Sequence, residues 1–383
     1  MTLAHIKKPE SQLKTAAAHQ KHWEKAALGT PKLPFQRNRK FTQVQHISMD
    51  NWLSREGSGA GFACANGAVA MMVAAAAGWR VMLYGLLAML CLDAHAAQEL
   101  AMVELAPGVF VHVGVHAAAT PENHGAIANV GFIVGERCVA VIDSGGSFEE
   151  GVALRSAISA RTTLPVCYVI NTHVHPDHVY GNAAFAADRP HVVGHRNLAA
   201  SMRARQGYYV GYLERTIGPA QSAVSVAVPP DTAVASTQSI ELGGRTLQLQ
   251  AWPTAHTDND LTVLDEKTGT LWTGDLLFTE RIPVVDGKLT GWLTVMDRLQ
   301  QMPVTHVIPG HGTPGSDLAR MLVPQRRYLL ALGDGVRAAL KSHRTITQAT
   351  AEVGLEERGK WALFDEFHAH NVTVVFTELE WED

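Results

Sequence analysis

The chain has 383 residues, enough for two domains, and a formal net charge of −4 with histidine neutral. From residue 97 onward it holds 21 Lys and Arg residues and 31 Asp and Glu residues, a net charge of −10. Such an acidic chain does not attract phosphate backbones, so we expect no nucleic acid among its partners.

Residues 1–70 do not read as part of a folded domain. They hold ten Lys and Arg residues against four acids, little apolar periodicity and the Gly/Ser tract EGSGAGFACANG. A secretory signal works at the start of a nascent chain, and the next segment has signal features, so we expect translation to begin at Met71 or Met72. Residues 1–70 are then a non-native extension, and a real, disordered basic extension is the alternative.

Residues 71–96 have the three parts of a signal peptide. Arg80 precedes the apolar run VMLYGLLAMLCL, and an A-x-A cleavage site ends at Ala96. The run is shorter than the roughly 20 apolar residues that cross a membrane, and a buried helix is the alternative reading. We therefore expect a periplasmic or secreted protein, cleaved between Ala96 and Ala97, with no stable membrane span in its mature form.

After residue 97, strand and helix patterns alternate through one α/β domain, residues 97–383. Apolar runs between Gly-rich turns predict strands over 104–114, 128–147, 166–173, 191–194, 239–254, 260–275 and 305–312. Helical spacing predicts helices near 148–160, 181–185, 196–216, 291–302 and 316–340. Two cysteines remain, Cys138 and Cys167, each opening an apolar run; buried thiols and a disulfide both stay open.

The stretch NTHVHPDHVYGNAAF, residues 171–185, places three histidines and an aspartate directly after a buried strand. His173 and His175 are two residues apart, so in an extended segment both rings project to the same side. Pro176 breaks the strand, and Asp177 and His178 turn back toward the same point. Because such groups would repel one another without a cation, and zinc binds imidazole nitrogen and carboxylate oxygen, we predict a metal site.

Three further residues of ligand type also lie at or just after the ends of apolar strands. His256 comes just after an apolar strand, and Asp275 and His311 lie at the C-terminal ends of two more. Each is flanked by Gly or small residues, which leave room for other groups of the chain to approach the ligand side chain closely. The resulting order is HxHxDH, then His, then GD, then GHG, which is far more specific than any one of these residues alone.

This order, with VIDSG upstream, resembles the metallo-β-lactamase superfamily over essentially the whole chain after residue 97. The resemblance implies an α/β fold, the αββα sandwich, with a dinuclear metal site at one edge of the sheets. It implies one zinc on His173, His175 and His256, a second on Asp177, His178 and His311, and Asp275 bridging both. It also implies that Asp143, in VIDSG, supports the metal loop from behind.

The resemblance implies an enzyme, a zinc-dependent hydrolase with two Zn²⁺ per chain; iron is compatible with the same ligands. A water held between two dications is acidified toward hydroxide and attacks an ester, thioester or amide bond. Asp177 is the expected catalytic residue, orienting that water and passing its proton to the leaving group. Redox members of the superfamily typically have a carboxylate where this chain has His175, which disfavours reduction of oxygen or nitric oxide.

True β-lactamases of the superfamily carry Cys or Ser at the position of Asp275, whereas a bridging Asp resembles the glyoxalase II-like thioesterases. The stretches TPENHGAIANVGFIVG, DHVYGN, GDLLFTERIPVVDGKLTGW and NVTVVFTELEWED look like the quinoprotein relay system zinc metallohydrolases, a SoxH-like group. This resemblance implies a small-molecule substrate and a functional link to a quinoprotein dehydrogenase. A β-lactamase and a non-catalytic metal-binding accessory protein are the alternatives.

Other polar residues have weaker patterns. His124, in a loop, and Tyr180, after the metal loop, are candidates for contact with the substrate, although an exposed loop histidine is an equal reading. The pair Tyr208 and Tyr209, in a helical stretch, indicates packing rather than a binding cleft. The acidic residues of segment 378–383 are expected at a solvated edge.

Overall fold

A computed structural model describes residues 100–382. The predicted extension, residues 1–70, and the predicted signal peptide, residues 71–96, lie outside the described residues, so both stay predictions. Among the helices that are described, none combines the length and the apolar character needed to cross a membrane.

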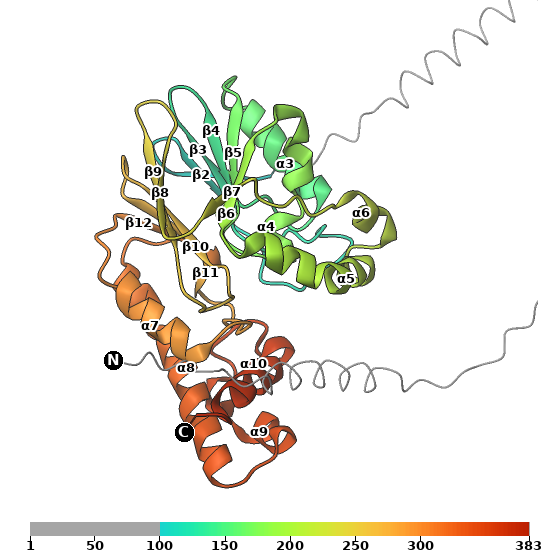
Figure 1. The fold of residues 1–383 in the computed structure, drawn as a ribbon, viewed down its shortest axis with the longest axis vertical. Helices are drawn as coiled ribbons and strands as arrows, with labels where there is room; N and C mark the ends of the chain where they lie inside the picture. Colours follow the sequence, from blue (N-terminus) through green and yellow to red (C-terminus); the bar gives the residue numbers. More distant parts are fainter. Residues whose placement is uncertain (1–99, 383) are drawn as a thin grey trace, which may run out of the picture. The chain divides into compact units, whose positions relative to one another are not determined.

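Two β-sheets lie at the centre of the described part (Figure 1). The first contains, in spatial order, β1 (Val103–Ala106), β2 (Val109–His112), β3 (Val130–Val134), β4 (Val139–Ile142), β5 (Val166–Ile170), β6 (His191–His195) and β7 (Thr232–Val234). The second runs in the order β12 (His306–His311), β11 (Thr270–Phe278), β10 (Leu261–Asp265), β9 (Thr246–Ala251) and β8 (Thr237–Glu241). Strands β4 to β7 are parallel, as are β11 and β12, so their carboxyl ends share an edge within each sheet.

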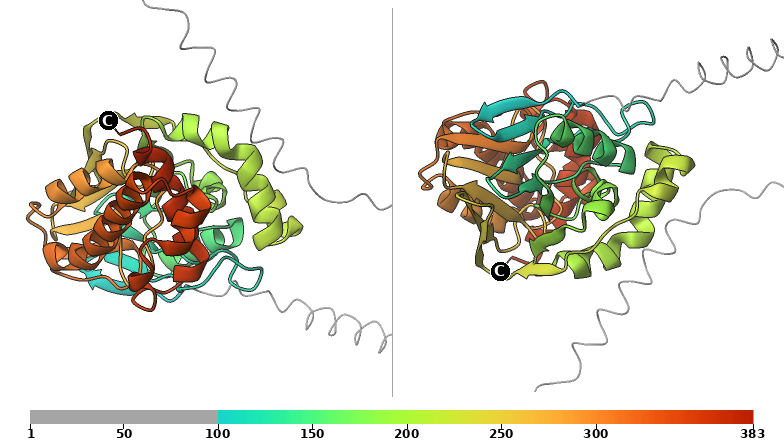
Figure 2. Two further views of the ribbon diagram at one scale, coloured as in Figure 1. Left: turned by 90° about the horizontal axis from the view of Figure 1, so that it is seen from below. Right: turned by 90° about the horizontal axis from the view of Figure 1, so that it is seen from above.

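Helices cover the outer face of each sheet, and the two views of Figure 2 show the same separation as Figure 1. On the side of the first sheet lie α3 (Phe148–Ser159), α4 (Pro176–Val179), the 3₁₀ helix η2 (Asn182–Asp188), α5 (Leu198–Thr216) and α6 (Pro219–Val224). On the side of the second lie α7 (Leu289–Leu299), α8 (Leu318–Lys341), α9 (Ile346–Glu352), η3 (Leu355–Glu357) and α10 (Phe364–Leu379).

The buried side chains form layers that match this order. Ile142 of the first sheet and Leu249 and Trp272 of the second belong to one apolar cluster between the sheets. Leu154 of α3 packs on the outer face of the first sheet, and Trp292 of α7 belongs to the cluster behind the second. Apolar burial on both faces of each sheet is the main stabilising contribution of such an arrangement. The predicted αββα sandwich is therefore confirmed.

The C-terminal segment differs from the prediction. Its last long helix, α10, was not expected, and the solvated edge is wrong for Glu378, which is half-buried. The Glu378 carboxylate accepts hydrogen bonds from the backbone N–H groups of Leu289 and Thr290, at 2.7 and 3.2 Å. These donors open α7, whose own N-cap residue Lys288 supplies no side-chain acceptor, so Glu378 satisfies the start of that helix from another element.

Cys138, directly before β4, and Cys167, on the neighbouring strand β5, are both free thiols. Burial raises the pKa of Cys138 to about 12, and a hydrogen bond with Cys167 adds to the shift. The thiol of Cys138 is therefore protonated at neutral pH and is a weak nucleophile.

Candidate metal centre

The predicted metal loop begins where β5 ends and turns at Pro176, the first residue of α4. Proline suits this position because its missing N–H would have no partner there. Asp143 fixes the start of the loop: its carboxylate accepts from the backbone N–H and the hydroxyl of Thr172, both at 2.7 Å. The loop is thus held from behind by the residue that the sequence predicted for that place.

The first group of ligand atoms consists of three imidazole nitrogens and a carboxylate, from His173, His175, His256 and Asp275. The Nε2 atoms of His173 and His256 lie 3.1 and 2.9 Å from His175 Nδ1. One proton cannot serve three ring nitrogens that face one another, so lone pairs are left in opposition unless a cation binds them.

The second group contains Asp177, His178 and His311. Asp177 Oδ2 lies 3.3 Å from His311 Nε2 and 3.9 Å from His178 Nε2. Within each group all the ligand atoms lie within 4.8 Å of one another. The structure therefore brings the seven predicted ligands together in two neighbouring groups, with Asp275 in the first; metal binding by them stays a prediction.

Asp275 lies between the sets. Its Oδ2 is 3.4 Å from His256 Nε2 and 3.5 Å from His311 Nε2, while its Oδ1 is 3.2 Å from His178 Nε2. This is the placement that a bridging carboxylate requires. Gly310 makes room for it, because a Cβ at that position would lie 1.9 Å from Asp275 Oδ1.

Two ligand atoms have no hydrogen-bond partner: His178 Nε2 and Asp275 Oδ1, both buried. A buried polar atom without a partner costs roughly 1–3 kcal/mol, which a bound cation would offset. Imidazole nitrogen and carboxylate oxygen are the ligands that zinc prefers. The residues therefore fit two divalent cations, and the identity of the metal as zinc stays a prediction.

The outward-facing nitrogens of the same rings have partners of their own. The contacts are His173 Nδ1 to Thr172 Oγ1 at 3.0 Å, His175 Nε2 to Asp286 Oδ2 at 3.1 Å, His178 Nδ1 to Asp143 Oδ2 at 2.8 Å, His256 Nδ1 to the Val284 carbonyl at 2.6 Å, and His311 Nδ1 to the Ile127 carbonyl at 2.8 Å. A carboxylate or carbonyl partner holds the proton on the outward nitrogen and leaves the inward nitrogen free to bind a metal.

The electrostatics of the two sets differ. Burial lowers the pKa of His256 to about 3, so this ring is neutral and able to act as a ligand. Burial also opposes charge on His178, but the carboxylates of Asp275, Asp143 and Asp177 outweigh it and hold its pKa well above the usual value. The negative potential around His178 is one that a bound cation would neutralise in place of the proton.

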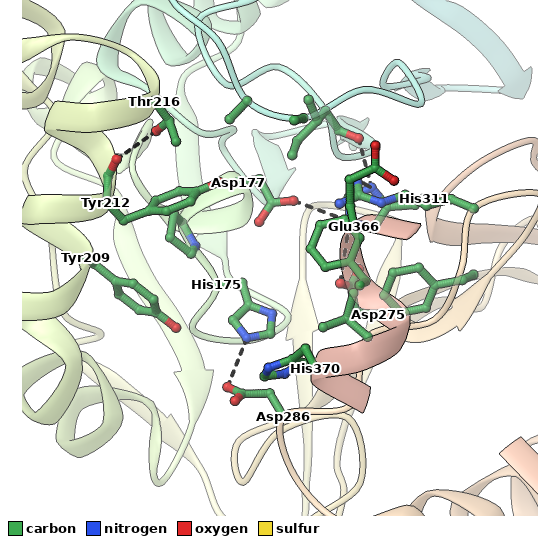
Figure 3. A pocket seen from close by; sticks show the side chains of 18 of the residues that line it. His175, Asp177, Tyr209, Tyr212, Thr216, Asp275, Asp286, His311, Glu366 and His370 are labelled. Carbon is green, nitrogen blue, oxygen red and sulfur yellow. Dashed lines mark hydrogen bonds and ion pairs between the residues drawn. The ribbon is translucent and has the colours of Figure 1, made fainter. Parts of the chain in front are cut away.

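A cavity of about 440 Å³ lies over the two sets. Strand ends supply one wall, with His175, Asp177 and Asp275, and Figure 3 shows Tyr209 and Tyr212 of α5 on the side opposite Asp275. Figure 3 also shows Glu366 and His370 projecting from α10. The cavity therefore has a ligand wall made by the ends of strands and loops, and a helical wall made by α5 and α10.

Tyr208 and Tyr209 both line the cavity. The packing prediction is confirmed for Tyr209, which is buried in an apolar cluster with Tyr180, but it is wrong for Tyr208. Tyr208 is 69% exposed, which a packing residue would not be. Tyr212 joins them one helical turn after Tyr208. The spacing YYxxY was the signal in the sequence that could have identified this face of α5.

The two residues predicted to contact the substrate lie elsewhere. His124 Nδ1 is 3.4 Å from Glu149 Oε2 at the start of α3. Tyr180 is 2% exposed and packs against Tyr209, with ring centroids 6.4 Å apart. Neither is among the residues that line the cavity, so the structure gives no support for substrate contact by either.

Three charged residues that line the cavity were missed: Glu366 on α10, and Arg281 and Asp286 in the loop after β11. The last two concern the ligand wall. Arg281 and Asp286 belong to the stretch GDLLFTERIPVVDGKLTGW, which the sequence analysis used only for its resemblance. Asp286 accepts a hydrogen bond from His175 and also lies 3.4 Å from Arg205 Nη2 on α5. Burial acts to raise the pKa of Asp286, but the hydrogen bond with His175 and the charge of Arg205 outweigh burial and hold the pKa below its usual value. The available signal in the sequence was the pair of charges, Arg281 and Asp286, on either side of the apolar residues IPVV shortly after Asp275.

Comparison with known proteins agrees with this geometry. Residues 125–311, which include all seven ligands, match the family model described as the metallo-beta-lactamase superfamily. No curated protein sequence matches the chain.

Two solved structures are among those similar to this chain. A metallo-beta-lactamase from Pontibacter korlensis is 21% identical, with 61% of this chain and 99% of that chain covered and a TM-score of 0.49. The stereoselective inverting sec-alkylsulfatase Pisa1 from Pseudomonas sp. is 17% identical, with 73% and 50% covered and a TM-score of 0.53. Residues 125–311 are therefore similar in sequence to the metallo-β-lactamase superfamily, and the two-sheet fold with outer helices is consistent with that family's fold.

Proposed function

We propose that the protein is a dizinc hydrolase that cleaves the ester, thioester or amide bond of a small acyl compound. The observation that carries the proposal is Asp275, whose two carboxylate oxygens face ligands of both sets. A carboxylate in that position fixes the separation of two cations and leaves the cavity side of the pair open to a substrate. When bound, the cations would lower the pKa of a shared water and polarise the bond under attack.

Asp177 is the proposed proton carrier. It is both a member of the second ligand set and a residue of the cavity lining. Burial acts to raise its pKa, but His178 and His311 outweigh burial and keep the carboxylate ionised. An ionised carboxylate at the cavity surface can accept a proton from the attacking water and deliver it to the leaving group.

The test is a substrate screen of the zinc-loaded protein against thioesters, lactones, aryl esters and the β-lactam nitrocefin. We expect about two zinc ions per chain, turnover of a thioester or ester, and weak or no turnover of nitrocefin. Asp177→Asn, which keeps the size of the side chain, should lower turnover with little change in thermal stability. A metal content near one with full activity would contradict the dinuclear mechanism.

Two other outcomes would redirect the proposal. Nitrocefin turnover with kcat/KM near 10⁵ M⁻¹s⁻¹ or above, about the ordinary range of enzymes, would identify a β-lactamase. Full metal content without turnover of any compound would favour a metal-binding accessory protein.

Export and the quinoprotein link remain part of the proposal and rest on the sequence alone. If residues 71–96 are a signal peptide, the exported protein should begin near Ala97 by N-terminal sequencing. Residues 1–70 found attached to the exported protein would contradict this. The link to a quinoprotein dehydrogenase predicts that deleting the gene impairs growth on an alcohol oxidised by such an enzyme.

A further inference from the structure

Arg281 is a buried cation in the wall of the cavity. It follows β11, is only 4% exposed, and lines the same cavity as Asp177 and Asp275. Its guanidinium carbon lies 5.3 Å from the centre of the Phe367 ring, on α10. The side chain is therefore held beside the catalytic centre, where the ligand wall meets the helical wall.

No carboxylate within residues 100–382 forms an ion pair with this guanidinium. Among the described residues, none of the ion pairs within 4.0 Å involves Arg281, whereas Arg205, close by, contacts both Asp258 and Asp286. The Nε atom of Arg281 is buried and has no hydrogen-bond partner. Buried charges in proteins are normally paired, because an unpaired one loses its hydration without compensation.

The contact of Arg281 with His311 does not replace such a pair. Arg281 Nη1 lies 2.9 Å from His311 Nδ1, but that nitrogen also lies 2.8 Å from the carbonyl oxygen of Ile127. With Nε2 of His311 facing the metal site, the ring proton is on Nδ1 and is donated to Ile127. A nitrogen that donates cannot accept from a guanidinium, so Arg281 then has two N–H positions without an acceptor.

We propose that Arg281 binds an anionic group of the substrate, so that the protein acts on acyl compounds that carry a carboxylate. This inference rests on the proposed hydrolase function and names its substrate class. A guanidinium presents parallel N–H donors that match the two oxygens of a carboxylate. The anion would lie beside His311, and the apolar part of the substrate would lie along Tyr209 and Tyr212, on the α5 side of the cavity.

The test compares two acids of the same shape on the zinc-loaded full chain. Succinate has a second carboxylate where 4-methylpentanoate has an isopropyl group, so only succinate offers Arg281 an anion while its first carboxylate reaches the metals. By calorimetry we expect succinate to bind at least 10-fold more tightly. Arg281→Gln should abolish the preference, and Arg281→Lys should keep part of it.

A matched control is Arg298→Gln, which removes the same charge from α7, where the guanidinium lies over Trp252 and outside this cavity. It should leave the preference unchanged. Equal binding of the two acids by the unaltered protein would overturn the proposal whether or not any Arg281 variant folds. A preference that survives Arg281→Gln would overturn it as well.

Turnover separates this proposal from the one on which it rests. Phenyl hemisuccinate and phenyl 4-methylpentanoate are the corresponding esters, and the first should have the higher kcat/KM. If succinate binds preferentially through Arg281 but neither ester is cleaved, the hydrolase proposal fails and the anion site stands. If both esters are cleaved equally and both acids bind equally, the anion site fails and the hydrolase stands.

Discussion

The two walls of the cavity are built in opposite ways. On the ligand wall, rings such as His173 and His256 are buried, and each is held by a hydrogen bond at its outward nitrogen. On the helical wall, Tyr208 is largely exposed, and it makes no side-chain hydrogen bond that would fix its hydroxyl among the described contacts. For the proposed hydrolase, this difference predicts that the strand ends set the position of the reaction. It also predicts that the helical wall selects the shape of the substrate and can be changed without disturbing the metals.

One loop, residues 281–286, joins the walls. Asn371 of α10 accepts from the backbone N–H of Val285 at 2.9 Å and donates to the carbonyl of Pro283 at 2.7 Å. The same loop supplies the Val284 carbonyl that orients His256, and Asp286, which orients His175. Helix α10 therefore holds the loop, and the loop in turn orients two predicted metal ligands, His256 and His175.

The largest effect should come from the centre of the ligand wall. Asp275→Cys removes the carboxylate that faces both sets, so metal content should fall below two per chain and turnover should fall by about 10²-fold or more. Metal analysis and turnover of the best substrate from the screen would measure both. If Asp275→Cys or Asp275→Ser left turnover untouched, the bridging role would be wrong, and the thioesterase-like assignment with it.

A smaller effect is expected one step behind the ligands, at Asp143. This residue has a φ of +53°, a conformation that asparagine tolerates, so Asp143→Asn should fold while losing the charge that faces His178. Loss of such a partner typically lowers metal affinity by about 10- to 100-fold. A chelator competition titration would measure this. An unchanged affinity would mean that His178 is oriented by the loop backbone alone.

The ligand wall was predictable from the sequence because its geometry is local. The HxHxDH spacing fixes the directions of His173, His175 and Asp177 over six residues, and each remaining ligand follows a recognisable strand. The αββα sandwich and the division of the seven residues into two sets were implied by the family resemblance that this order of motifs carries.

The helical wall was not predictable in the same way. Whether Tyr208 faces a cavity or a core depends on how α5 packs against residues distant in the sequence. The hydrophobic periodicity of a short sequence window contains no information about that packing. Arg281 and Asp286 are ordinary charged residues until the fold places them beside His311 and His175. Helix α10 was missed because four apolar residues in VTVVF suggest a strand as readily as a helix.

On the helical wall, substitution should change substrate preference and leave the metals in place. Tyr208→Ala removes an exposed ring, so thermal stability should hardly change, while kcat/KM for an aryl ester should fall about 5-fold relative to a small acetyl ester. Val210→Ala is the matched control, since Val210 is exposed on the same helix and lies outside the cavity lining. Loss of metal from the Tyr208 variant would contradict the separation of the two walls.

The smallest effect on turnover is expected from Glu150, which lies behind the ligand wall on α3 and outside the cavity lining. Its Oε2 accepts from the Gly146 N–H at 2.7 Å, but its Oε1 has no partner and the side chain is buried. Burial raises the pKa of Glu150 to about 8, the Gly146 N–H opposes the shift, and the charge of Asp177 adds to it.

The folded state therefore favours the protonated form of Glu150. The stability that this form contributes is fully present below pH 4.5, the ordinary pKa, and is lost as the pH rises through about 8. Glu150→Gln cannot ionise, so between pH 5 and pH 9 its free energy of unfolding should fall less than that of the unaltered protein, by on the order of 3 kcal/mol. Urea unfolding at fixed metal content would measure the two profiles. Parallel profiles would mean that the carboxyl ionises in the folded state as readily as in water, and that the turn it holds is open to solvent.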